Sequence, residues 1–65
     1  MKMLTQTQEL LLDGLRAFGV EKDLIIGIMI MLTEEEQQEQ LMEWMADHEE
    51  AMPETILQKA TDIAR

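Results

Sequence analysis

The stretch that decides the fold is residues 24–32, Leu-Ile-Ile-Gly-Ile-Met-Ile-Met-Leu, nine consecutive residues without a charge. A short apolar run is typical of either a buried strand or a buried helix, and periodicity alone does not separate the two. The acids in Glu21-Lys22-Asp23, directly before the run, suit the positive end of a helix dipole, and Leu and Met favour helices. A strand would also have no partner, because the flanking segments are helical in pattern. We therefore predict a helix over residues 21–32, although its four isoleucines favour a strand.

Apolar side chains occupy most of the circumference of this predicted helix, and the remaining arc holds only Asp23 and Gly27. A helix that is apolar nearly all round is typically buried, so the pattern predicts that 21–32 is the central helix of the domain. Gly27 has no Cβ, so it is either a point of close approach by another helix or a residue merely tolerated in a crowded position. The run is too short to span a bilayer, which takes about 20 apolar residues.

The 65 residues predict one small helical domain, residues 1–65. A chain of this length buries only about 60% of its unfolded surface, so its stability is marginal. It has no cysteine, which excludes disulfides and thiol chemistry. The first residues do not form the continuous apolar segment of a secretory signal. We therefore expect a cytoplasmic protein.

The charge is concentrated in one part of the chain. The formal net charge is −9, from 14 acidic and 5 basic residues, and residues 33–54 contain nine of the acids and no Lys or Arg. Such a surface repels nucleic-acid phosphates and anionic membranes and attracts a basic partner. The alternative is a solvated helix face that only keeps the protein soluble.

The first predicted helix, over about residues 5–18, is bounded by two local signals. Thr5 followed by Gln8 matches a capping box, in which each side chain bonds the other residue's backbone N–H. Thr7 is a second candidate cap. Gly19 stands where a left-handed residue is expected to end the helix.

Two further helices complete the predicted fold. Thr33 followed by Glu36 matches a second capping box and predicts a helix over about 34–50, while Pro53 suits the first turn of a helix over 53–64. The sequence therefore predicts an all-α bundle of four short helices, in which short loops make consecutive helices antiparallel neighbours. Its predicted core includes Leu24, Ile25, Ile28, Ile56, Leu57 and Ile63.

The chain offers little chemistry. It has no Ser, Cys or Tyr, so nucleophilic triads are excluded. The single histidine, His48, is either a metal ligand beside Asp47, Glu43 or Glu50, or a residue favoured by the negative end of a helix. The second interpretation is the stronger, and no glycine-rich phosphate loop is present. We expect no enzyme, no cofactor and no metal site.

Direct nucleic-acid binding conflicts with the charge. If Gly19 were the turn of a helix-turn-helix motif, the recognition helix would be the apolar segment 22–32. If the turn were at Thr33, three acids would face the phosphates: Glu34, Glu35 and Glu36. We expect no direct nucleic-acid binding and no membrane binding.

Three segments together, Arg16-Ala17-Phe18-Gly19-Val20, the apolar run and Thr33-Glu34-Glu35-Glu36-Gln37-Gln38, resemble a class of short, acidic, all-helical, uncharacterised proteins of bacteria and mobile elements. The resemblance covers most of the chain and implies no activity. Such proteins usually have Thr or Ser before the Pro-Glu of the last helix. Here Met52 stands in that place and weakens the cap.

Two hypotheses for function remain. The first is a protein–protein interaction or structural module, a homodimeric helical bundle whose acidic third helix faces a partner. The second is an antitoxin-like or DNA-mimicking regulator that occupies a basic partner protein. The candidate contacts are Met42 and Trp44, either apolar contacts for a partner or ordinary core, with Glu35, Glu39 and Glu43 as the charged rim.

Overall fold

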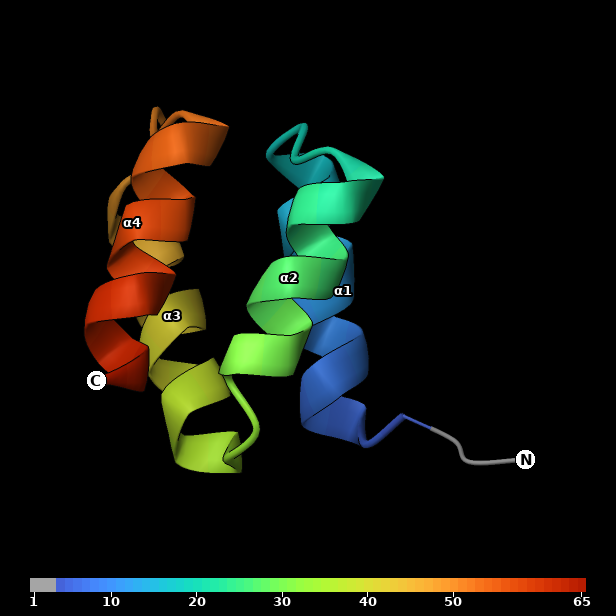
Figure 1. The fold of residues 1–65 in the computed structure, drawn as a ribbon. Helices are drawn as coiled ribbons and strands as arrows, with labels where there is room; N and C mark the ends of the chain where they lie inside the picture. The colour runs from blue at the N-terminus through green and yellow to red at the C-terminus, as the bar shows by residue number, and fades with distance from the viewer. Residues whose placement is uncertain (1–3) are drawn as a thin grey trace.

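The computed structural model describes residues 4–65, and these residues form four α-helices and no strand. The helices are α1 (Gln6–Ala17), α2 (Lys22–Met31), α3 (Glu35–Asp47) and α4 (Pro53–Ala64) (Figure 1). The all-α prediction is confirmed, and the predicted bounds match within a residue everywhere except at the end of the third helix. Met1-Lys2-Met3, part of the segment considered for a secretory signal, lies outside the described residues.

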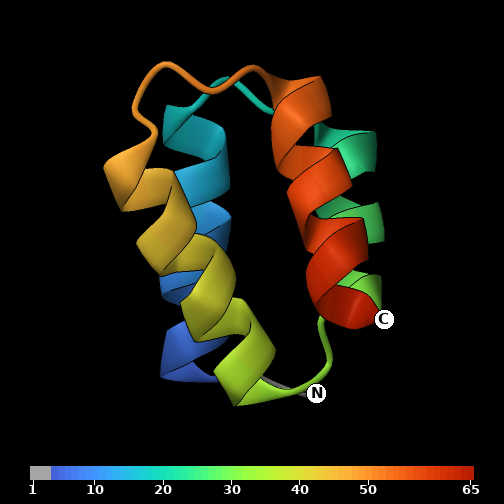
Figure 2. The same ribbon diagram turned by 90° about the vertical axis from the view of Figure 1, so that its left-hand side faces the viewer.

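The four helices stand at the corners of a square. α1 packs against α2 and α3, and α4 packs against the same two helices, so α2 and α3 lie diagonally opposite (Figures 1 and 2). The expectation that all consecutive helices are neighbours is therefore wrong for α2 and α3. The prediction of a central helix over 21–32 is also wrong, because α2 has two neighbouring helices, like each of the others.

α1 begins and ends as the sequence indicates. Thr5 Oγ1 accepts a bond from the Gln8 backbone N–H at 3.1 Å, and Gln8 Oε1 accepts one from the Thr5 N–H at 2.8 Å. At the other end Gly19 has a φ of +79°, and the Val20 N–H donates to the Leu15 carbonyl at 3.0 Å. This bond, from two residues beyond the C-cap Phe18 back to the last turn of the helix, completes a Schellman motif, and Val20 is buried.

α3 begins one residue later than the capping-box pattern predicts. The residue at its N-cap is Glu34 rather than Thr33, and the Gln37 side chain, not that of Glu36, accepts the bond from the cap residue's backbone N–H, at 3.2 Å. Two pairs of residues could cap the start of α3: Thr33 with Glu36, and Glu34 with Gln37. The second pair provides the cap.

α3 ends at Asp47, three residues before its predicted end at residue 50. The His48 backbone N–H donates to the Met45 carbonyl at 3.1 Å, which leaves the Trp44 carbonyl without its usual helical donor. The His48 ring fills that place, with Nδ1 2.7 Å from the Trp44 oxygen. Because a carbonyl oxygen only accepts, Nδ1 carries the hydrogen.

The core lies between the four helices. Its buried apolar residues are Leu11, Leu15, Val20, Ile25, Ile28, Leu32, Leu41, Met45, Ile56 and Ala60. Of the predicted core residues, Ile25, Ile28 and Ile56 are buried, while Leu24, Leu57 and Ile63 are partly buried and pack against that cluster.

One polar side chain is buried with the core. Gln38 is 2% exposed, and its Nε2 donates to the Leu32 carbonyl at 2.7 Å. Leu32 is the residue at the C-cap of α2, so this bond satisfies a carbonyl that no longer has a helical partner. The sequence analysis gave Gln38 no structural role, because nothing in the local pattern shows that its side chain reaches the end of the preceding helix.

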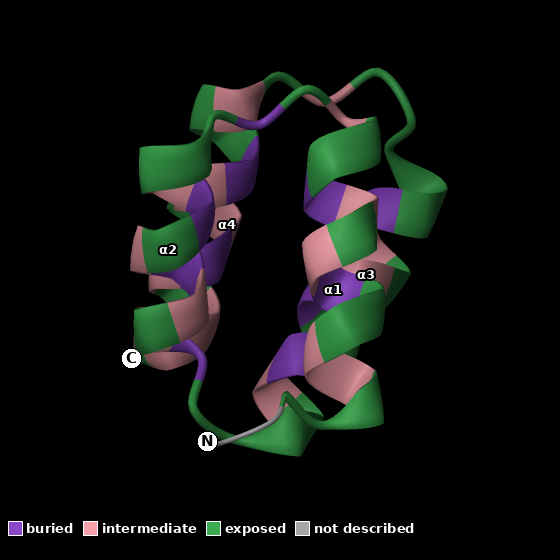
Figure 3. Ribbon diagram, turned by 90° about the vertical axis from the view of Figure 1, so that its right-hand side faces the viewer, coloured by how far each residue is buried: buried purple, intermediate pink, exposed green. Residues whose placement is uncertain are grey.

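Much of α2 is exposed. The outward side of this helix is coloured as exposed in Figure 3. Ile26 and Ile30 are 48% and 69% exposed, so α2 is less buried than its nearly all-round apolar pattern predicts. α1 and α4 cover only two sides of it. Within residues 4–65, no helix is long and apolar enough to cross a membrane.

Candidate interaction surfaces

The first candidate surface is acidic and lies on α3. All nine acidic residues of segment 33–54 are exposed. Those of the helix itself are named here the acidic surface: Glu35, Glu36, Glu39, Glu43 and Asp47. Leu41 and Met45 bury the opposite side of α3, so the carboxylates face solvent. Helical spacing at three and four residues places them in adjacent turns.

One member of the acidic surface also has a structural contact. The Thr7 hydroxyl donates to Glu35 Oε2 at 2.7 Å and joins the first turn of α1 to the first turn of α3. Thr7 therefore lies inside α1 and bonds across the bundle, and its role as an alternative cap is not realised. Glu39 and Glu43, which have no such bond in the described part of the chain, are the more available carboxylates.

Met42 and Trp44, the predicted apolar contacts, are only partly exposed. Both pack against the core cluster, on either side of Leu41 and Met45, the apolar α3 side chains that belong to it. Met42 is therefore less exposed than expected for a residue whose main role is to contact a partner. Truncating it would disturb packing as well as any contact with a partner.

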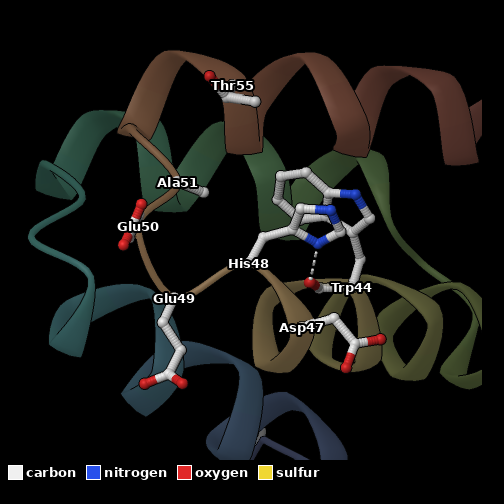
Figure 4. A pocket seen from close by; sticks show the side chains of 7 residues that line it. All are labelled: Trp44, Asp47, His48, Glu49, Glu50, Ala51 and Thr55. Atoms are coloured by element: carbon white, nitrogen blue, oxygen red, sulfur yellow. Dashed lines mark hydrogen bonds between the residues drawn. The ribbon is translucent and has the colours of Figure 1, made fainter.

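Trp44 and His48 form a stacked pair beside the start of α4. Their ring centroids are 4.2 Å apart with an interplanar angle of 16°, and the ring bond to the Trp44 carbonyl fixes His48 in this position (Figure 4). The pair lines a hollow of 460 Å³ together with Asp47, Glu49, Glu50, Ala51 and Thr55. The histidine therefore has a structural role at the C-terminal end of α3.

The carboxylates around this hollow do not converge. Figure 4 shows Asp47, Glu49 and Glu50 pointing in different directions and away from the His48 ring. Among residues 4–65 there is no group of three or more His, Cys, Asp or Glu residues placed to hold a metal ion. The hollow thus offers an aromatic edge and scattered negative charge rather than a coordination site.

The second candidate surface is apolar and lies on the outward side of α2. It is named here the α2 apolar face and consists of Ile26, Gly27 and Ile30 with Leu12 of α1. Leu12 and Ile26 line a second hollow, of 440 Å³, with Arg16, Val20, Lys22 and Ile25. The two hollows are nearly equal in volume, so their linings rather than their sizes distinguish them.

The sequence pointed to this surface only indirectly. Gly27 was a candidate either for close approach by another helix or for a crowded position, and a Cβ built on it meets no atom of the neighbouring described residues within 4 Å. The position is open, which contradicts the crowded alternative, and no helix within residues 4–65 makes the close approach. The surplus of apolar side chains in 24–32 was the signal that one copy leaves part of α2 uncovered.

The fold and these surfaces define a small four-helix bundle with one acidic helix and, diagonally opposite, one apolar exposed helix. No family model, curated protein or solved structure matches this chain. What the protein does is therefore argued from these two surfaces.

Proposed function

We propose that this protein is a non-enzymatic protein–protein interaction module, a cytoplasmic homodimeric bundle that presents the acidic surface of α3 to a basic partner protein. The observation that carries the proposal is the separation of charge. All nine acids of segment 33–54 are exposed, and the segment itself has no Lys or Arg. Lys59 of α4 lines a hollow with Glu43 and Asp47, so a base lies beside the C-terminal part of the acidic surface. A field that is mostly of one sign steers and selects an oppositely charged partner.

Burial within the bundle supports a contact surface over a catalytic one. The side chains of α3 that face inward, Leu41 and Met45, are committed to the core. Those that face outward are carboxylates without a nucleophile or metal cluster near them in the described residues. Such a helix recognises charge and shape, and it leaves no group arranged for bond making or breaking.

The test is affinity purification from the native host followed by binding measurements on the partner recovered. The triple variant Glu36→Gln/Glu39→Gln/Glu43→Gln is expected to lower affinity for that partner at least tenfold. Glu9→Gln/Asp13→Asn/Glu21→Gln removes the same charge from exposed sites elsewhere and is expected to change it little. Equal losses in both variants would show that only net charge matters and would refute a contact through α3.

The second candidate is an antitoxin-like or DNA-mimicking regulator that occupies the nucleic-acid site of a basic protein. It is favoured by the density of exposed carboxylates, five of them within the 13 residues of α3. Mimicry predicts that duplex DNA competes for the partner and that affinity falls steeply with salt. An apolar contact is insensitive to salt and responds to Met42→Ala instead, and because Met42 also packs against the core, unfolding of that variant is measured alongside binding.

A further inference from the structure

We infer that two copies of this chain associate through the α2 apolar face, with their α2 helices crossing in antiparallel orientation near Gly27. The inference rests on the proposed function, because it specifies the surface through which the proposed homodimer forms. It makes α2 the seam between two copies and leaves α3 of each copy free for a partner.

The α2 apolar face has no cover within the described chain. From Leu24 to Leu32 the helix carries no charge, yet Ile30 is 69% exposed and Ile26 is 48% exposed. The two isoleucines lie one turn apart, on one side of the helix. Beyond the exposed Asp23 in the first turn, this side of α2 carries no charge, and an apolar helix side of this kind is typically covered.

Gly27 lies about 60° around the helix from Ile30, at the edge of the side that the isoleucines share, and provides space for a second helix. A Cβ built on Gly27 meets no atom within 4 Å, and the residue lies in ordinary helical conformation near the middle of Lys22–Met31. A glycine inside a helix is less favourable than alanine. Among the described residues no close contact at Gly27 offsets this disadvantage, whereas close approach of a second backbone does.

Charge favours a second copy over another occupant. The described residues 4–32 contain four acids and two bases, so this half of the bundle carries little of the net charge and offers little to a strongly charged protein. The acidic surface lies on α3, diagonally opposite α2. Docking through α2 therefore keeps the two acidic helices on the far sides of the dimer, well beyond the Debye length of about 8 Å at physiological salt. Docking through any face that includes α3 brings them together.

The orientation follows from the ends of the helix. Asp23 and Lys22 lie in the first turn of α2, while its last turn carries no charge. An antiparallel crossing places the positive end of each helix dipole beside the negative end of the other and keeps the two Asp23 residues apart. A two-fold axis through the crossing makes the contact self-complementary.

The expected affinity is modest. A helix of 10 residues is about 15 Å long, so a contact through α2 and its flanks lies at the small end of specific interfaces. We therefore expect a dissociation constant in the micromolar range.

The test is sedimentation equilibrium of the whole chain from 1 to 500 µM. Ile30→Glu is expected to make the protein monomeric throughout this range while leaving its circular dichroism unchanged. The matched control is Leu10→Glu, at an apolar residue of α1 that is 55% exposed and lies about 200° around that helix from Leu12. It is expected to dimerise like the parent chain.

Two outcomes would refute the α2 apolar face as the contact between copies: a dimer that persists in Ile30→Glu, or a dimer that Leu10→Glu disrupts equally. Either outcome would still leave the parent chain a homodimer. A parent chain that stays monomeric up to 500 µM overturns both the seam and the dimeric part of the proposed function. Gly27→Ala tests the crossing point. It is expected to weaken the dimer about tenfold while raising the melting temperature at 1 µM, and an unchanged or tighter dimer refutes a crossing at Gly27.

Discussion

At the scale of single residues, two side chains close helix ends that the backbone leaves open. Gln38 bonds the free carbonyl of Leu32 after α2, and His48 bonds the free carbonyl of Trp44 in the last turn of α3. Both are polar residues whose partners lie within six residues along the chain. They determine where the helices end as much as the apolar pattern does.

Replacing Gln38 by Met is expected to lower the free energy of unfolding by about 1–3 kcal/mol, because the Leu32 carbonyl loses its buried partner. Met has a similar length and helix propensity, so little else changes. The measurement is urea unfolding followed by circular dichroism. Gln40→Met, at an exposed site of the same helix, is the control and is expected to change stability by less than about 0.5 kcal/mol. Equal effects at the two sites would contradict a special role for Gln38.

Two glycines allow the effect of backbone conformation to be distinguished from the effect of available space for a side chain. Gly19 has a φ of +79°, so Gly19→Ala is expected to cost about 1–2 kcal/mol. Gly14 is helical, and a Cβ there meets Met45 Cε at an ordinary 3.5 Å, so Gly14→Ala is expected to add about 0.5–1 kcal/mol. Thermal unfolding of both variants measures the contrast. A stabilising Gly19→Ala would show that the Schellman turn tolerates another conformation.

At the scale of elements, local signals located most helix boundaries. Thr5 with Gln8, Gly19 and Pro53 each act through bonds or dihedral angles within a few residues, so the sequence alone was sufficient to place them. The end of α3 was missed because no Gly or Pro marks it. A histidine ring replaces a backbone donor there, and that substitution has no sequence signature.

The start of α3 provides a test of competing caps. Gln37→Ala is expected to cost about 1 kcal/mol, since its side chain accepts from the Glu34 N–H. Thr33→Ala is expected to cost less than about 0.5 kcal/mol, because Thr33 lies outside the cap that forms. Chemical unfolding of the two variants gives the comparison. The reverse order would restore the Thr33–Glu36 box that the sequence pattern favours.

At the scale of the whole molecule, the arrangement of helices depends on contacts that the sequence does not specify. The three residues between α2 and α3 permit either adjacency or a diagonal crossing, and the structure has the crossing, with Gln38 buried against the end of α2. Apolar side chains cover most of the circumference of α2, and this pattern led to the prediction of a central helix. The pattern did not show which side of α2 would stay exposed.

The diagonal arrangement also determines how charge acts on the fold, because the acidic surface lies on a single helix. Four like-charged pairs lie three or four residues apart along α3: Glu35–Glu39, Glu36–Glu39, Glu39–Glu43 and Glu43–Asp47. Each such pair costs roughly 0.2–0.5 kcal/mol, so together they oppose folding by about 1–2 kcal/mol at low salt.

Raising NaCl from 0.02 to 0.5 M at neutral pH is therefore expected to stabilise the monomer by about 1 kcal/mol, because the Debye length falls below the spacing of these carboxylates. The measurement is urea unfolding of the Ile30→Glu variant at a few micromolar, where association does not contribute. Adding Glu39→Gln removes three of the four pairs and is expected to reduce the salt effect by more than half. Adding Glu49→Gln instead changes the net charge equally, but in the loop after α3, and is expected to leave most of the effect. If stability fell with salt, attraction rather than repulsion would dominate among the charges of the monomer. The carboxylates of the acidic surface would then be paired within the bundle rather than free for a basic partner, as the proposed function requires.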